Sequence, residues 1–204
     1  MTHLAVGLIK KRLSDAFGES VRKTYDVIGE PADLSGAQEL ATNEPYQFQY
    51  WALDLAGARQ SDQKKGADRG IDGRLYFHDE PPGGKTKQII FSVKGGHVQA
   101  AYIRDLRGVI EREEAEIGVL ICMEGPTKPM RKEAAEAGFY KPPGLEDRFP
   151  RIQILTIEEL LAGKTVEFPP YREDVTHRKA PKVRAAAEKK GTLAFEEPAG
   201  DEPF

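Results

Sequence analysis

Apolar residues recur every three or four positions in four stretches of the chain, with charged residues between them, and this spacing predicts amphipathic helices. The predicted helices cover residues 4–17, 43–57, 98–116 and 127–137. Gly18 stands where the first helix needs a C-cap. Asn43 is expected to cap the second helix, with Pro45 in its first turn.

Shorter apolar runs predict strands between these helices. They lie at residues 25–28, 71–77, 88–94, 118–123 and 152–155. The segment 79–84 is rich in turn-forming residues, so the strands on either side of it are expected to form a β-hairpin. A brief helical turn is predicted at 35–40, and a capping box at Thr156 predicts a last short helix. The order of elements indicates the α/β class, with a mixed β-sheet flanked by helices.

Length and composition suit one globular domain with a charged tail. The chain has 204 residues, of which 39% are hydrophobic and 31% charged. Residues 1–42 are expected to form a helical and strand lead-in, and 43–170 the core. Residues 171–204 contain a basic stretch, an acidic stretch and few large apolar residues, which predicts a flexible tail.

Charge, cysteine content and hydropathy exclude several classes. The formal net charge of −3 excludes a globally basic nucleic-acid coat protein, so any DNA contact requires a local patch. The single cysteine, Cys122, excludes an internal disulfide framework and a thiolate zinc cluster. No apolar run approaches the length of a membrane span, and the short run 4–9 leads directly into basic residues, so we expect a cytoplasmic protein. Two Gly-Lys-Thr segments, 84–86 and 163–165, lack the first glycine of a P-loop and predict no nucleotide site.

The most informative polar residues lie at the ends of the two hairpin strands. Asp72 heads one strand and Lys94 ends its neighbour, so antiparallel pairing brings them to one edge of the sheet. A carboxylate that holds Mg²⁺ or Mn²⁺, beside a lysine that polarises water, suits hydrolysis of a phosphodiester. Gly95 and Gly96 would let a sugar-phosphate backbone approach closely. The plain alternative is a turn aspartate and a solvated lysine.

A resemblance supports the catalytic alternative. Residues 66–73, followed by Ser92-Val93-Lys94, resemble the Mrr-like branch of the restriction-endonuclease superfamily, whose PD-(D/E)xK signature is an Asp and then a Glu/Gln/Ser-x-Lys on the adjacent strand. Residues 103–108 and 118–121 resemble the next helix and core strand of that branch. The chain to about residue 170 is also similar to the C-terminal region of some bacterial adenine-specific DNA methyltransferases, through segments 46–51, 64–68, 93–96 and 129–134. The resemblance implies a restriction-endonuclease-like fold and Asp72, Ser92 and Lys94 as catalytic positions.

Two departures from that signature weaken the implied metal site. Ser92 replaces the usual Glu or Gln, and Gln49 stands where related nucleases often place a Glu on the first core helix. Because Mg²⁺ is usually held by one or two carboxylates together with phosphate oxygens and water, Asp72 is expected to need an anionic helper. The following helix offers Asp105, which we favour over Glu111 as the second metal ligand.

Cations and glycines around the implied site are the candidate DNA contacts. They are Lys64, Lys65, Arg69, Gly95, Gly96, Thr127, Lys128 and Arg131. Helix N-termini with nearby cations bind phosphates well, whereas a solvated charged face explains each residue singly.

Three functions therefore remain open at the level of sequence. The first is a Mg²⁺-dependent DNA endonuclease of a restriction–modification or DNA-methyltransferase system. The second is a non-catalytic DNA-binding or targeting module of an adenine methyltransferase, in which Ser92 and Gln49 mark a decayed metal site. The third is a protein-interaction domain that docks on a methyltransferase or helicase subunit. The partners expected are DNA and a methyltransferase domain or subunit, and the sequence leaves a homodimer open.

Overall fold

The computed structural model describes residues 2–61, 70–79, 85–169 and 179–182. The helices are α1 (His3–Phe17), the 3₁₀ helix η1 (Glu19–Lys23), α2 (Leu34–Asn43), α3 (Pro45–Leu55), α4 (Ala100–Arg112), α5 (Lys128–Glu136) and α6 (Ile157–Leu161). The strands are β1 (Arg59–Gln60), β2 (Gly73–Phe77), β3 (Lys87–Lys94), β4 (Ile117–Cys122), β5 (Phe139–Tyr140), β6 (Phe149–Pro150) and β7 (Ile152–Thr156). No helix in this described part is long and apolar enough to cross a membrane.

Five strands form a mixed sheet in the order β1-β2-β3-β4-β7. The predicted hairpin is confirmed, because β2 and β3 pair antiparallel with Gly73 opposite Phe91. Strands β3, β4 and β7 are parallel, and helices form their crossover connections. Lys94 is the register partner of Cys122, so β3 and β4 end side by side. The predicted α/β class with a mixed sheet flanked by helices is therefore correct.

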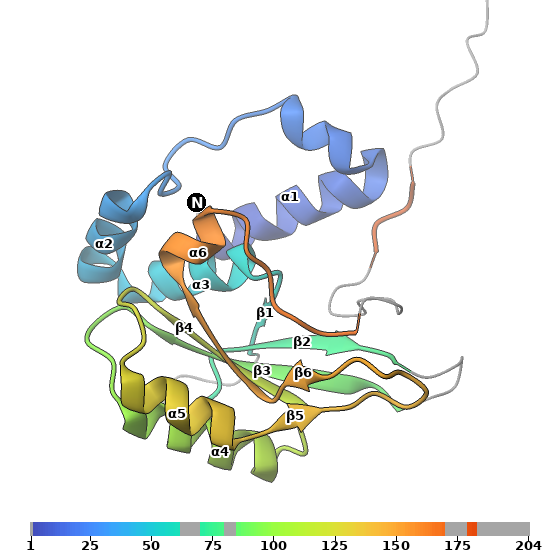
Figure 1. Ribbon diagram of the computed structural model, residues 1–204. Helices are drawn as coiled ribbons and strands as arrows, with labels where there is room; N and C mark the ends of the chain where they lie inside the picture. Colours follow the sequence, from blue (N-terminus) through green and yellow to red (C-terminus); the bar gives the residue numbers. More distant parts are fainter. Residues whose placement is uncertain (1, 62–69, 80–84, 170–178, 183–204) are drawn as a thin grey trace, which may run out of the picture.

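Helices cover both faces of the sheet (Figure 1). On one face, α3 buries Phe48, Trp51 and Leu53 against β2 and β3. On the other face, α4 and α5 pack over β3, β4 and β7, with Ile103 and Leu106 among the buried contacts. Strand β4 lies between the two layers and is buried at every position, as its continuous apolar run predicted.

Two local predictions in the first quarter of the chain are wrong. Residues 25–28 form no strand, and Ile28 is 98% exposed because no sheet edge lies beside it. Asn43 does not cap the second core helix; it ends α2, which is longer than the predicted turn, and Glu44 takes the N-cap position of α3 without a side-chain bond. Pro45 explains the break, because a residue before proline is driven out of the helical region.

Candidate functional site

The carboxylate of Asp72 lies at the edge of the sheet, one residue before β2. Its Oδ2 accepts a hydrogen bond of 2.7 Å from the backbone N–H of Val93. Its own backbone N–H donates to the carbonyl of Phe91 at 2.9 Å. Asp72 is therefore fixed against β3 by main-chain bonds, as expected for a residue that heads a paired strand.

Gln49 of α3 provides the second partner of this carboxylate. Its Nε2 donates to Oδ1 of Asp72 at 2.9 Å. The helix presents Gln49 at this edge because the neighbouring Phe48 and Trp51 are buried against the sheet. An ionised carboxylate only accepts hydrogen bonds, so each oxygen of Asp72 already holds one N–H group. An amide thus occupies the position at which the sequence resemblance implied an anionic metal ligand.

Lys94 ends β3 near this carboxylate but leans toward a different helix. Its Nζ lies 5.3 Å from the centre of the Tyr102 ring of α4, a cation–π contact. Within the described residues it forms no ion pair, and none joins it to Asp72. Ser92, two residues earlier, is buried with 7% of its surface exposed. The three implied catalytic positions therefore share one end of the hairpin without an ionic contact between Asp72 and Lys94.

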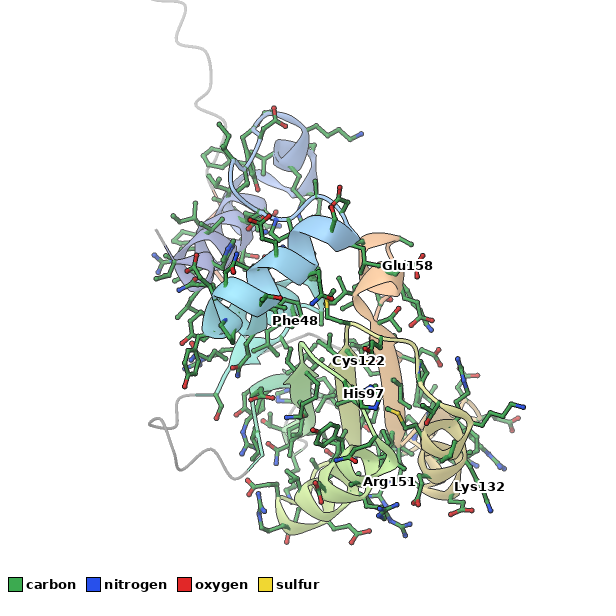
Figure 2. All side chains as sticks on the ribbon, turned by 90° about the vertical axis from the view of Figure 1, so that its left-hand side faces the viewer. Phe48, His97, Cys122, Lys132, Arg151 and Glu158 are labelled. Carbon is green, nitrogen blue, oxygen red and sulfur yellow. The ribbon has the colours of Figure 1, made fainter. Side chains whose placement is uncertain are left out.

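The loops that follow β3 and β4 meet beside Lys94. His97 from the first loop and Glu124 from the second approach to 3.0 Å, between Nδ1 and Oε2. Figure 2 shows His97 on this side, between the ribbon of α3 and that of α5. We call this region the carboxyl edge and define it by Lys94, residues 95–99 and residues 124–128. In α/β sheets with parallel strands, ligands bind characteristically at such an edge.

The two glycines after Lys94 have different surroundings. A Cβ on Gly95 would lie 3.1 Å from the Cβ of Ala41 and 3.2 Å from the ring of Phe48. A Cβ on Gly96 would meet nothing within 4 Å. Packing against α2 and α3 therefore explains the glycine at 95, whereas position 96 faces open space. Contact of either glycine with DNA stays a prediction.

The N-terminus of α5 borders the carboxyl edge. Thr127 is its N-cap, and its Oγ1 accepts a hydrogen bond of 3.4 Å from the backbone N–H of Met130. Lys128 and Arg131 are exposed in the first turns and form no ion pair with another described residue. Thr127 therefore has a structural role, and two cations are available to an anionic ligand. Lys64, Lys65 and Arg69, the other predicted DNA contacts, lie outside the described residues.

The predicted second metal ligand receives no support. Asp105 is exposed on α4, whose buried face is formed by residues such as Ile103 and Leu106, and it forms no hydrogen bond or ion pair with Asp72. No group of three His, Cys, Asp or Glu side chains gathers as a metal site among residues 2–61, 70–79, 85–169 and 179–182. The carboxylate of Asp72 is engaged by the Gln49 amide and the Val93 N–H, and two hydrogen-bond donors at a single carboxylate do not fit the requirements of Mg²⁺.

Cys122 is not a nucleophile. It lies fully buried in β4, and its thiol is 3.8 Å from the carbonyl oxygen of Leu155. Burial raises the pKa of the thiol to about 11, and the charges of Glu159 and Glu124 add to the effect. The thiol is protonated at neutral pH and has a packing role, as its place in the apolar run predicted.

One polar cluster escaped the sequence analysis. At the far end of the hairpin, Lys87 Nζ lies 3.1 Å from Oδ1 of Asp79 and 2.8 Å from the hydroxyl of Tyr140, which also donates to Asp79. The side chain of Asp79 is fully buried. No local signal joins these residues, because Tyr140 is 61 positions after Asp79. The cluster lies at the other end of the hairpin from Asp72 and Lys94, and its polar groups bind one another.

Comparison with known proteins identifies a family and a similar solved structure. The family model described as "NACHT-associated inactive Restriction Endonuclease 1" matches residues 45–162, more than half of the chain. No curated protein matches the sequence. A solved structure of the MspJI restriction endonuclease in complex with a 27-mer oligonucleotide aligns with a TM-score of 0.49 and 14% identity, over 71% of this chain. The aligned part spans only 33% of that protein's chain.

Proposed function

Because the chain belongs to the family of NACHT-associated inactive restriction endonucleases 1, we propose that its restriction-endonuclease-like domain binds DNA at the carboxyl edge without cleaving it. The observation that carries the proposal is the hydrogen bond from Gln49 to Asp72. An amide N–H directed at a carboxylate places positive charge density where a bound cation would have to sit. The carboxylate is thereby stabilised in the absence of any metal.

Ser92 and Asp105 add to the argument against hydrolysis. A neutral hydroxyl takes the place of the second carboxylate on β3, and Asp105 is exposed on α4 without contact to Asp72. A single carboxylate already engaged by two N–H donors is a poor Mg²⁺ site. Without the metal, the charge that builds on the phosphate during hydrolysis lacks a divalent counterion, and the reaction loses its main source of acceleration.

The same edge retains what phosphate binding needs. Lys94 carries a charge that no described carboxylate neutralises, and Lys128 and Arg131 extend this surface along the first turns of α5. The N-terminus of a helix adds N–H groups and the positive end of its dipole. Such contacts position a protein on DNA without reading its sequence. Since the whole chain carries −3, binding depends on this local surface.

The proposal is tested by measuring binding and cleavage on the same DNA. Fluorescence anisotropy with labelled duplex should show binding that falls steeply with added salt, and a supercoiled plasmid with Mg²⁺ or Mn²⁺ should stay uncut. Lys94→Ala and the pair Lys128→Ala/Arg131→Ala should weaken binding by roughly tenfold or more, by loss of charge-assisted phosphate contacts. The matched control is Arg12→Ala/Lys23→Ala, which removes two exposed cations from the other end of the molecule.

Two outcomes would overturn the proposal. Plasmid cleavage that needs a divalent metal and disappears in Lys94→Ala would restore the endonuclease interpretation, which the retention of Asp72 and Lys94 favours. Equal losses of affinity from the test and control variants would mean that DNA contacts another surface. A methyltransferase partner and a homodimer stay predictions. The family's description makes a NACHT-domain protein the further partner class to test.

A further inference from the structure

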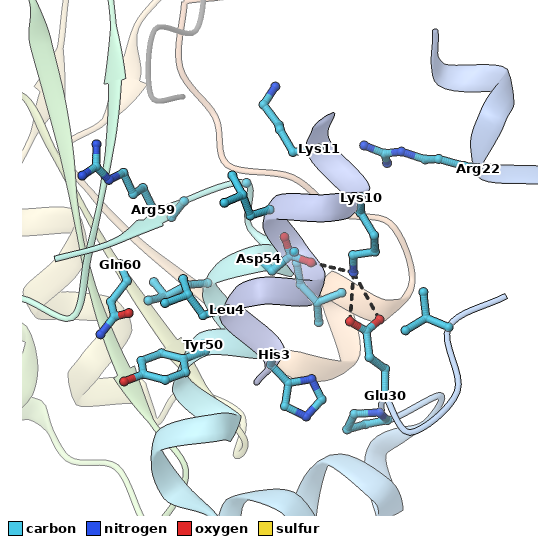
Figure 3. A pocket seen from close by; sticks show the side chains of 18 of the residues that line it. His3, Leu4, Lys10, Lys11, Arg22, Glu30, Tyr50, Asp54, Arg59 and Gln60 are labelled. Carbon is cyan, nitrogen blue, oxygen red and sulfur yellow. Dashed lines mark hydrogen bonds and ion pairs between the residues drawn. The ribbon is translucent and has the colours of Figure 1, made fainter. Parts of the chain in front are cut away.

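A cavity of about 910 Å³ lies between the N-terminal segment and the family domain (Figure 3). Its walls come from α1, from the segment that follows η1, from α3 and from β1. The first two of these precede the residues matched by the family model. Residues 45–162 alone therefore do not enclose this cavity; the lead-in segment completes it beside α3. The volume of the cavity lies in the range of small-molecule sites.

Three charged side chains form the floor of this cavity. Nζ of Lys10 lies 3.1 Å from both carboxylate oxygens of Glu30 and 2.6 Å from Oδ2 of Asp54. Burial alone would lower the pKa of Lys10, but the two carboxylates outweigh it and raise that pKa. The ammonium is therefore charged at neutral pH. Because two carboxylates face one ammonium, the floor carries a net negative charge and favours a ligand group that donates hydrogen bonds.

The helix packing keeps this floor in place. Gly7 of α1 lies directly against Asp54, and a Cβ at position 7 would come within 2.5 Å of its Oδ1. A glycine is therefore required for α1 to approach α3 this closely. The ion pairs join α1, the loop at Glu30 and α3, so these three of the four walls are held together by the groups that line the floor.

Cations outnumber carboxylates at the rim of the cavity. Lys11, Arg22 and Arg59 line it, Asp26 also belongs to the lining, and Figure 3 shows the three cations on the side away from His3 and Tyr50. Lys11 pairs with Asp15, with 3.6 Å between Nζ and Oδ1. Nε of Arg22 donates to Ser14 at 3.1 Å and pairs with Glu19 at 3.0 Å. Both contacts use Nε, so the two Nη groups keep the fork of donors that suits an oxyanion.

Aromatic and aliphatic side chains complete the lining. Tyr25 and Tyr50 supply two rings, and Leu4 and Leu8 of α1 are each nearly half exposed beside them. A ring face of this kind stacks on a planar heterocycle with little dependence on its identity. The cavity thus combines a floor that accepts hydrogen bonds from a ligand, an aromatic wall and a rim whose cations can bind an anion.

We propose that this cavity binds a nucleoside phosphate, with the base over the acidic floor and the tyrosines and the phosphates at Arg22 and Lys11. A simple inorganic anion fits poorly, because the floor repels it. A simple cation fits poorly, because the rim repels it. A ligand whose planar base carries N–H donors, in the ring or on an amino group, and whose other end is anionic satisfies both regions. No P-loop is involved, in line with the absence of that motif from the sequence.

Calorimetric titration of the full chain with ATP, GTP, CTP and UTP, each separately, tests the proposal, with inorganic triphosphate as the reference anion. At least one nucleotide should bind about tenfold or more tighter than triphosphate, since only the nucleotide reaches the floor and the tyrosines. Arg22→Ala should weaken that nucleotide about tenfold, whereas Lys23→Ala, its neighbour outside the lining, should change affinity by less than about twofold. Tyr50→Leu, which keeps an apolar side chain, should also weaken the nucleotide.

Three results would overturn it: no binding of any of the four nucleotides, equal affinity for triphosphate and nucleotide, or binding that neither Arg22→Ala nor Tyr50→Leu reduces. Circular dichroism melting of each variant separates loss of the site from loss of the fold. DNA affinity should be unchanged in Arg22→Ala, because the cavity and the carboxyl edge are separate. This test is therefore independent of the proposed function.

Discussion

The side-chain amide of Gln49 donates a 2.9 Å hydrogen bond to the carboxylate of Asp72. Replacing that amide with a second carboxylate reverses the electrostatics of the site. Gln49→Glu should lower the melting temperature without metal, by a few degrees, because two carboxylates then face each other. Mn²⁺ should restore the lost stability in the variant and have no effect on the parent protein. Thermal melts with and without Mn²⁺ measure both effects, and Gln38→Glu on the exposed face of α2 is the control.

A second carboxylate on β3 extends this test to activity. Gln49→Glu combined with Ser92→Glu adds two carboxylates to Asp72 at the end of the hairpin where Lys94 lies, which matches the needs of a divalent metal. We expect weak Mn²⁺-dependent nicking of supercoiled plasmid that disappears when Lys94→Ala is added. Metal binding without any nicking would mean that the site has lost more than its ligands.

The buried pair of Lys87 and Asp79 should contribute strongly to stability. Lys87→Ala leaves the Asp79 carboxylate buried without its counter-charge, and we expect a cost of about 3 kcal/mol in the free energy of unfolding. Lys85→Ala, two residues before Lys87, removes an exposed ion pair with Glu114 and should lower the free energy of unfolding by less than about 1 kcal/mol. Urea denaturation at neutral pH compares the two. Similar midpoints for both variants would contradict the structural role of the cluster.

Glu116 gives a pH-dependent prediction. Desolvation raises the pKa of this carboxyl, so its charged form is disfavoured in the folded state. The folded state is therefore helped by protonation below the unfolded pKa, and that help is lost as the pH rises through the folded pKa. Glu116→Gln keeps an acceptor for the backbone N–H of Gln88 and removes the charge. The melting temperature of the variant should exceed that of the parent at pH 7, by on the order of 1–2 °C, and the gain should shrink toward pH 4.

Alanine substitutions at Gly95 and Gly96 distinguish an effect on packing from an effect on the approach of DNA. Gly95→Ala should lower the free energy of unfolding by about 1 kcal/mol, because its methyl group presses on Ala41 and Phe48. Gly96→Ala meets open space and should leave stability unchanged. If DNA passes close to this loop, only the second variant lowers DNA affinity without lowering the melting temperature. Chemical denaturation and anisotropy on both variants decide this.

The sequence predicted the elements whose signals are local. The amphipathic pattern of α4, the apolar run of β4 and the capping box at Thr156 each depend on residues a few positions apart, and all three are present. The hairpin placed Asp72 and Lys94 at one end of the sheet for the same reason. The prediction of a strand at residues 25–28 was wrong because a β-branched and aromatic run forms a strand only beside a partner strand, which this segment lacks.

The contacts that decide chemistry were out of reach of the sequence. The substitution at Gln49 was visible, but only the fold shows its amide bound to a residue 23 positions away. The ion pair of Lys10 and Asp54 joins residues of two helices. Asp105 lies on the exposed face of α4, and its distance from the sheet depends on how that helix packs. Such relationships depend on how the helices pack, which periodicity does not specify.

The cluster at the far end of the hairpin also bears on how the chain folds during synthesis. Strands β2 and β3 are neighbours in sequence and can pair as soon as both have left the ribosome. Tyr140, however, lies 53 residues beyond Lys87. The hydroxyl that binds this ion pair is therefore synthesised well after both hairpin strands. In the interval, hydration of Asp79 and Lys87 opposes closure of that end. We therefore expect the turn end of the hairpin to gain its full set of buried contacts only once Tyr140 of β5 has been made.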